Sequence, residues 1–128
     1  MIYYFSKTKE VPFEKALKEV TEKLREEGFG ILTEIDVRQT LKEKLDVDYR
    51  KYIILGACNA PYAYQALQAE DKIGTMLPCN VVVQEISEGV TEIAAVDPVA
   101  SMQAVVNPKL TEVARQIQTK LRRVIENC

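Results

Sequence analysis

Two similar phrases hold the side chains of this sequence that are best suited to chemistry. Cys58-Asn59 and Cys79-Asn80 each stand within two residues of a proline. Two thiols brought to one place permit a reversible disulfide, a nucleophilic thiolate or the binding of a soft metal ion. The spacing is not that of a Cys-x-x-Cys redox motif, and a zinc site normally has about four ligands, often with histidine among them. Cys58 and Cys79 are therefore only weak candidates for metal ligands.

Several common kinds of chemistry lack their residues in this chain. There is no histidine, which removes the commonest general base near neutral pH, the usual partner of a nucleophilic Ser or Cys, and the commonest metal ligand. The five glycines form neither a dinucleotide fingerprint nor a Walker motif. These absences disfavour many classes of enzyme, and no motif indicates a cofactor.

Three predicted strands position the two cysteine phrases. Residues 52–57, 81–86 and 90–96 are rich in β-branched and apolar residues, and Ser87-Glu88-Gly89 predicts a tight turn between the last two. If the first two of these strands are antiparallel, the end of one and the start of the next lie at the same edge of the sheet. The returning third strand brings Asp97 to that edge. We therefore predict one pocket formed by five residues: Cys58, Asn59, Cys79, Asn80 and Asp97.

Each of these five residues also has a simpler structural interpretation. Asp97 precedes Pro98 and is a good helix cap. Asn59 and Asn80 stand at element boundaries, where asparagine often bonds to nearby backbone. A buried cysteine commonly behaves as a small apolar side chain. Only their convergence favours a ligand-binding role.

The remaining elements complete an α+β fold. Residues 2–6 and 29–35 predict two more strands, so that the sheet has about five, and Phe13 to Leu24 shows helical periodicity, with Gly28 beyond its end. Asp36 predicts the cap of a short helix through Leu45, and Pro61 begins another with Tyr62, Ala63, Ala66 and Leu67 facing inward.

Asn107 and Pro108 begin a long final helix whose buried face is predicted to contain Leu110, Val113, Ala114, Ile117, Leu121 and Val124. The order favours a largely antiparallel sheet covered by a long N-terminal and a long C-terminal helix, with short helical insertions.

Composition limits the class of protein. The chain has 128 residues, 47% of them hydrophobic and 28% charged, which predicts a single globular domain over residues 1–128. A net charge of −2 gives no excess of cations for nucleic acid. The sequence has no run of about 18 apolar residues, so we expect no membrane span. An odd count of three cysteines suits a reducing compartment, which favours the cytoplasm, and Cys128 is expected to be a mobile bystander.

Four phrases together resemble one known family, the domain of unknown function family 302 (DUF302). They are GFGILTEIDV (28–37), LGACNAP (55–61), AYQAL (63–67) and LPCNVVV (77–83). The resemblance implies one repeat of the TATA-binding-protein architecture, with a curved antiparallel sheet, often as a homodimer. It does not imply DNA binding, because one fold hosts unrelated functions. One departure is Ala60, since proline often follows the asparagine more closely in the family.

Three functions are consistent with these residues. The first is a homodimeric module in which the curved sheet and a helix enclose a small pocket for a small-molecule ligand, and the second protomer buries what one protomer leaves open. The second is thiol redox chemistry or soft-metal binding by Cys58 and Cys79. The third is a structural domain that engages another protein. The tyrosines near the third predicted strand line a pocket or fill the core, and we favour core filling for these four: Tyr49, Tyr52, Tyr62 and Tyr64. We rank the binding module first because the chain lacks a catalytic set.

Overall fold

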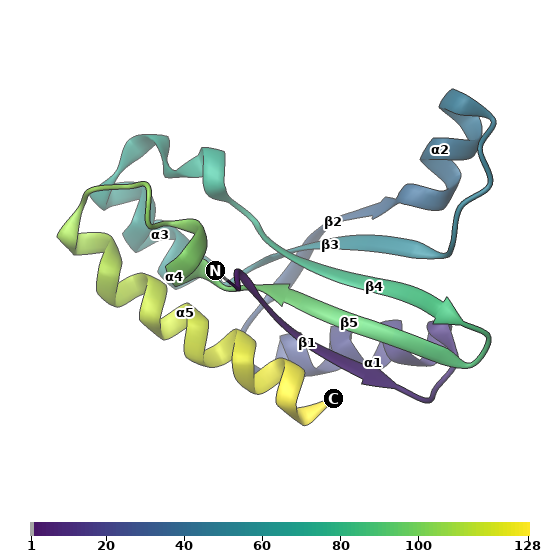
Figure 1. The fold of residues 1–128 in the computed structure, drawn as a ribbon. Helices are drawn as coiled ribbons and strands as arrows, with labels where there is room; N and C mark the ends of the chain where they lie inside the picture. Colours follow the sequence, from purple (N-terminus) through teal and green to yellow (C-terminus); the bar gives the residue numbers. More distant parts are fainter. Residues whose placement is uncertain (1) are drawn as a thin grey trace.

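Five antiparallel strands form one sheet in the computed structural model, which describes residues 2–128. The strands are β1 (Tyr4–Lys9), β2 (Gly30–Asp36), β3 (Tyr52–Cys58), β4 (Cys79–Ser87) and β5 (Val90–Val96). Their order across the sheet is β1-β5-β4-β3-β2, and Figure 1 shows the sheet twisting along its length. The predicted five-stranded antiparallel sheet and the hairpin of its last two strands are confirmed.

Two long helices, α1 (Phe13–Glu26) and α5 (Pro108–Asn127), pack on one face of this sheet (Figure 1). Successive side chains of a strand point to opposite faces, so alternate residues of β4 and β5 face the helices. The side chains that meet there are buried together in the main core: Val20, Leu24, Val81, Val83, Ile93, Ala95, Leu121 and Val124. The predicted α+β class, with a long helix near each end of the chain, is confirmed.

Local sequence signals fix several helix ends. Asp36 accepts a hydrogen bond from the backbone N–H of Gln39 at 3.0 Å and caps α2 (Val37–Leu45). Asn107 accepts from the N–H of Lys109 at 3.0 Å and caps α5. Gly28 ends the turn after α1 with φ of 89°, a left-handed conformation that favours glycine. The predicted capping residues Asp36 and Asn107 and the predicted stop at Gly28 are therefore found where expected.

Three short helices form a second layer at one end of the sheet (Figure 1): α3 (Ala60–Ala69), the 3₁₀ helix η1 (Asp71–Met76) and α4 (Pro98–Ser101). Ala66 of α3 and Ile73 of η1 pack against Leu110 and Val113 at the start of α5. This smaller core continues the apolar face of α5 beyond the sheet. It anchors the loops that follow β3 and precede β4.

Some details of the predicted elements were wrong. The first strand runs from Tyr4 to Lys9 rather than over residues 2–6, because it pairs with β5 along the whole length from Val96 to Thr91. Leu67 was expected to face inward but is 43% exposed, because α3 buries only the side that faces α5, with Ala66 at its centre. Cys128 is half-buried and packs against the main core, so it is not a bystander.

The second edge strand, β2, is interrupted by a bulge. Its register with β3 shifts between Ile31 and Thr33, and Leu32 at the shift is 65% exposed. The extra residue of a bulge has no partner across the ladder. The edge of β2 is consequently not a continuous row of backbone donors and acceptors.

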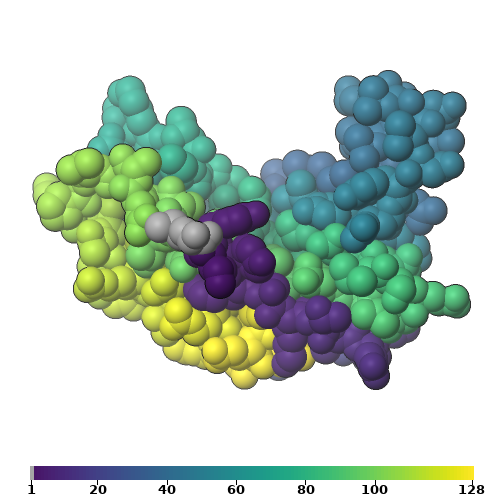
Figure 2. Space-filling view, viewed as in Figure 1, coloured from purple at the N-terminus to yellow at the C-terminus, as the bar shows by residue number. Residues whose placement is uncertain are grey.

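In the part of the chain that the structure describes, no helix packs across the face of the sheet opposite α1 and α5 (Figure 1). Helix α2 rises from this side at one end and has no buried residue, whereas α3 and η1 lie at the other end. Figure 2 shows the surface hollowed between these two ends. We call this side of the sheet the open face. Within residues 2–128, no helix has the length and apolar composition needed to cross a membrane.

Candidate functional site

The antiparallel pairing of β3 with β4 brings the two cysteine phrases together as predicted. Ala57 pairs with Cys79, so Cys58 follows directly at the same end of the sheet. Cys58, Asn59 and Cys79 line one cavity with side chains of α3, α4 and α5. The cavity has a volume of only about 30 Å³, room for about two water molecules. It is too small for an organic ligand.

Cys79 is held in its neutral thiol form. It is 8% exposed, and burial, with a smaller contribution from neighbouring Cys58, raises its pKa from 9.0 to about 11. Because the thiolate is the reactive form of cysteine, little nucleophile is present at neutral pH. Its surroundings are those of a core residue.

The raised pKa of Cys79 makes stability depend on pH in a defined direction. Above pH 9 the unfolded chain loses this proton, whereas the folded chain keeps it until about pH 11. The free energy of unfolding should therefore fall by about 2 kcal/mol between these values. Urea unfolding followed by circular dichroism across this range measures the fall. Cys79→Ala should make the fall smaller by this amount, while Cys58→Ala should retain it, and equal slopes in Cys79→Ala and the wild type would contradict the assignment.

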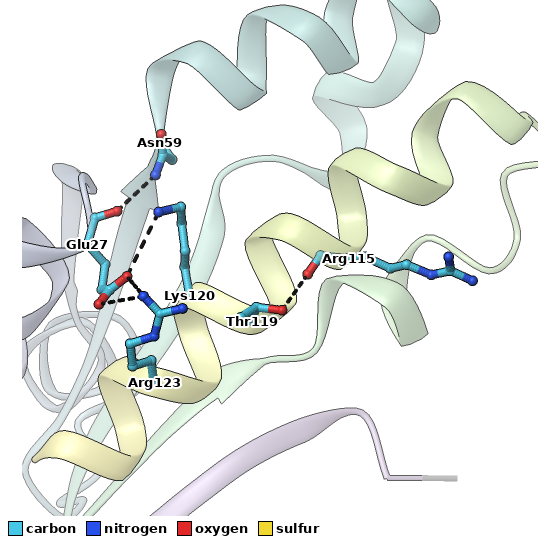
Figure 3. A network of polar contacts seen from close by, with 6 residues as sticks. All are labelled: Glu27, Asn59, Arg115, Thr119, Lys120 and Arg123. Carbon is cyan, nitrogen blue, oxygen red and sulfur yellow. Dashed lines mark hydrogen bonds and ion pairs between the residues drawn. The ribbon is translucent and has the colours of Figure 1, made fainter.

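Asn59 joins three segments rather than facing a ligand. Its side-chain amide donates to the backbone carbonyl of Glu27 at 3.1 Å, directly after α1 (Figure 3). The Glu27 carboxylate in turn pairs with Arg123 at 3.1 Å and with Lys120 at 3.9 Å, both on α5. Gly28 leaves room for the amide, since a Cβ there would lie 3.1 Å from Asn59 Nδ2. Asn59 thereby ties the end of β3 to α1 and, through Glu27, to α5.

The other two predicted site residues do not line this cavity. Asp97 caps α4 by accepting from the N–H groups of Val99 and Ala100, and its carboxylate also accepts from Gln118 at 3.0 Å. Asp97 is therefore a helix cap, the simpler of its two predicted roles. Asn80 follows Cys79 and points to the opposite side of the sheet, where it is exposed on the open face. The five residues share one end of the sheet but not one pocket.

The soft-metal alternative finds little support in this geometry. Across the described residues, 2–128, no group of three or more His, Cys, Asp or Glu side chains is placed to hold a metal ion. The residues that line the cavity with Cys58 and Cys79 include no Asp or Glu, and Asp97 is engaged by α4 and Gln118.

A larger hollow lies on the open face. It has a volume of about 420 Å³, within the range of about 300–1,000 Å³ that is usual for ligand pockets. We call it the open-face groove. Its floor is formed by alternate residues of β4 and β5, and tyrosines stand at its sides. It is lined by Tyr3, Tyr4, Tyr52, Asn80, Val82, Gln84, Glu92, Ala94, Ala95 and Val96.

A chain of polar contacts crosses one end of the open-face groove. Arg50 donates to Gln84 Oε1 at 3.2 Å, and Gln84 Nε2 donates to Glu92 Oε1 at 2.9 Å. Partial burial raises the pKa of Tyr52, with the neighbouring Tyr49, Tyr3 and Glu92 acting in the same direction. Tyr52 therefore stays a neutral phenol at physiological pH.

Of the residues that line this groove, the sequence pattern singled out only Asn80, as a site candidate, and Tyr52, as one of the tyrosines that line a pocket or fill the core. The signal that was present is the two-residue spacing of Asn80, Val82 and Gln84 on one strand and of Glu92 and Ala94 on the next. That spacing places them on one face, because successive strand residues alternate. The contributions of Tyr3 and Tyr4 depend on the pairing of β1 with β5, which no local pattern indicates.

The family model for the domain of unknown function DUF302 matches residues 5–128. The chain belongs to the DUF302 family. This DUF302 chain is also similar to a crystal structure of an uncharacterized conserved DUF302 protein from Bacillus stearothermophilus, at 27% sequence identity and a TM-score of 0.91. The similarity covers 100% of this chain and 99% of that one. No curated protein matches the sequence.

Proposed function

We propose that this DUF302 protein is a small-molecule-binding module whose site is the open-face groove. The observation that carries the proposal is the volume of the groove together with its lining. The groove has about 420 Å³, against about 30 Å³ for the cavity beside Cys58 and Cys79. A hollow of about 380 Å³ between α1 and β2 is similar in size, but most of its lining side chains are charged. The groove also combines apolar floor residues with a few polar groups, as ligand pockets commonly do.

A homodimer is part of this proposal, and the α2 arm supports it. We define the α2 arm as α2 with the following residues 46–49. Leu45 and Val47 on the arm are 66% and 44% exposed, and Ile35 on the neighbouring open face is 47% exposed. In a two-fold dimer the same surface of each chain forms the interface. Because the apolar arm and the apolar sheet face lie on the same side of the chain, the arm of each copy can pack on the sheet face of the other. A second copy would cover these side chains beside the groove.

The oligomeric state tests the role of the α2 arm. Sedimentation equilibrium of the wild type should give the mass of two chains. Leu45→Glu places a charge in the proposed contact and should give the mass of one chain, whereas Leu67→Glu on exposed α3 should leave the dimer intact. A monomeric wild type would contradict this part of the proposal and would leave the groove to be tested separately.

The two other functions have weaker support. Thiol chemistry would need a reactive thiolate, whereas burial keeps Cys79 protonated at neutral pH. A purely structural role in binding another protein would use the same exposed apolar side chains as the dimer. The volume and mixed lining of the open-face groove favour a small ligand over both.

Binding to the groove can be tested without knowing the natural ligand. A set of small aromatic and aliphatic fragments, both charged and neutral, is titrated into labelled protein and followed by ¹⁵N–¹H correlation spectra. We expect saturable shifts at the amides of Val82 and Ala94. Ala94→Phe should fill the groove and abolish them, whereas Ala104→Phe, at an exposed loop position away from the groove, should not. Shifts confined to the cysteine end, or none at all, would overturn the proposal.

A further inference from the structure

The charge of the open-face groove is carried by one side chain. Among its ten lining residues, Glu92 is the only one with a formal charge at neutral pH. Glu92 is half-buried on β5, and the residues paired with it across the sheet, Thr8 on β1 and Gln84 on β4, are neutral. The groove therefore has a negative floor without a lysine or arginine in its lining.

The hydrogen bonding of Glu92 leaves it free to accept a cation. Its Oε1 accepts from Gln84, and none of the ion pairs formed by residues 2–128 includes Glu92. A carboxylate has about four acceptor positions on its two oxygens. The nearby Arg50 is engaged elsewhere, since it donates to Gln84 and lies 5.7 Å from the centre of the Tyr49 ring. A half-buried carboxylate with one neutral partner favours a positively charged group.

Aromatic rings at the sides of the groove favour the same kind of group. Tyr3 and Tyr4 pack edge to face with ring centres 5.1 Å apart, and Tyr52 stands with Tyr49 at 6.2 Å. The face of an aromatic ring carries negative potential and attracts organic cations, as in the aromatic cages that bind quaternary ammonium groups. The raised pKa of Tyr52 keeps its phenol neutral.

We propose that the open-face groove binds an organic ammonium ion, with the cationic head at Glu92 and Tyr52, which lie in register on either side of Gln84. The apolar part of the ligand lies over Val82, Ala94 and Val96. This inference rests on the proposed function, because it names the class of ligand for the same groove. It is separable from that proposal, since a groove can bind small molecules without preferring cations.

The test compares choline with dimethylbutanol, its neutral carbon isostere, on the wild-type protein. Both are titrated against ¹⁵N-labelled protein. We expect choline to shift the amides of Gln84, Glu92 and Ala94 saturably, and dimethylbutanol to bind at least about tenfold more weakly. Glu92→Gln should weaken choline binding by about tenfold with little effect on dimethylbutanol. Glu88→Gln, an exposed charge neutralisation in the β4–β5 turn, is the matched control and should change neither.

Each outcome decides between the two proposals. Equal affinity for the two probes, or undiminished choline binding by a folded Glu92→Gln variant, overturns the ammonium assignment and leaves the groove as a binding site. Choline shifts at residues outside the groove overturn the assignment as well. If neither probe nor any fragment binds at the groove, both the ammonium assignment and the proposed small-molecule-binding function are wrong. The comparison of probes on wild-type protein remains decisive even where a variant is unstable.

Discussion

Gly56→Ala is expected to lower the free energy of unfolding by about 3 kcal/mol, near the upper end of the usual cost of overpacking. Gly56 lies on β3, facing the open side of the sheet. A Cβ at this position would overlap Thr33 Oγ1 on β2 and lie 2.8 Å from Pro78 Cγ, which is closer than real Cβ contacts. The threonine can rotate away, but the proline ring has no such freedom. The substitution must therefore displace the chain that leads into Cys79.

A matched glycine separates this steric effect from a general effect of losing glycine. Gly74→Ala on η1 has no heavy atom within 4 Å of the added Cβ and should leave the unfolding midpoint nearly unchanged. Adding Thr33→Ala to Gly56→Ala should recover only part of the loss, because the contact with Pro78 remains. Urea unfolding of the four proteins measures this, and a Gly56→Ala protein as stable as the wild type would refute the close packing described.

Leu121→Ala is expected to cost about 2–5 kcal/mol of unfolding free energy. Leu121 is 0% exposed and lies on α5 in the main core, packed among the buried residues of α1 and the sheet. Truncation removes its apolar contacts and leaves a cavity that rigid neighbours fill only in part. The same core supports the strands whose opposite side forms the groove.

The control for Leu121 is the same substitution on an exposed helix face. Leu67→Ala on α3 removes a side chain that is 43% exposed and should cost less than about 1 kcal/mol. Thermal unfolding of both variants measures the two losses of unfolding free energy, and we expect the larger loss for Leu121→Ala. Equal losses would mean that Leu67 is buried in solution, as the sequence pattern first indicated.

Much of the fold follows from local sequence pattern. The helical spacing from Leu110 to Val124 placed the buried face of α5 correctly, because a 3.6-residue period leaves only one apolar side. The short Ser87-Glu88-Gly89 segment indicated the β4–β5 hairpin in the same way. These features depend on contacts between near neighbours in the chain.

Features that depend on which element packs against a helix or strand were predicted less well. Leu67 and the apolar residues of α2 show a helical pattern, but a pattern does not show whether another element covers it. The predicted convergence of the cysteine phrases was right for the end of the sheet, whereas Asn80 and Asp97 are separated by strand alternation and by a helix cap. The open-face groove needs side chains from β1, β3, β4 and β5, so its lining is set by the order of strands.

The pairing of β1 with β5 has a consequence for how the chain is made. Tyr4 leaves the ribosome long before Val96, its partner in the sheet. Contacts between residues so distant in sequence form late and slow the acquisition of native structure. During synthesis the hydrogen-bonding edge of β1 has no native partner until β5 emerges, and the core beneath it is completed only by α5. A nascent chain stalled before Val96 should therefore remain open to misassociation, with β2, β3 and β4 already able to pair.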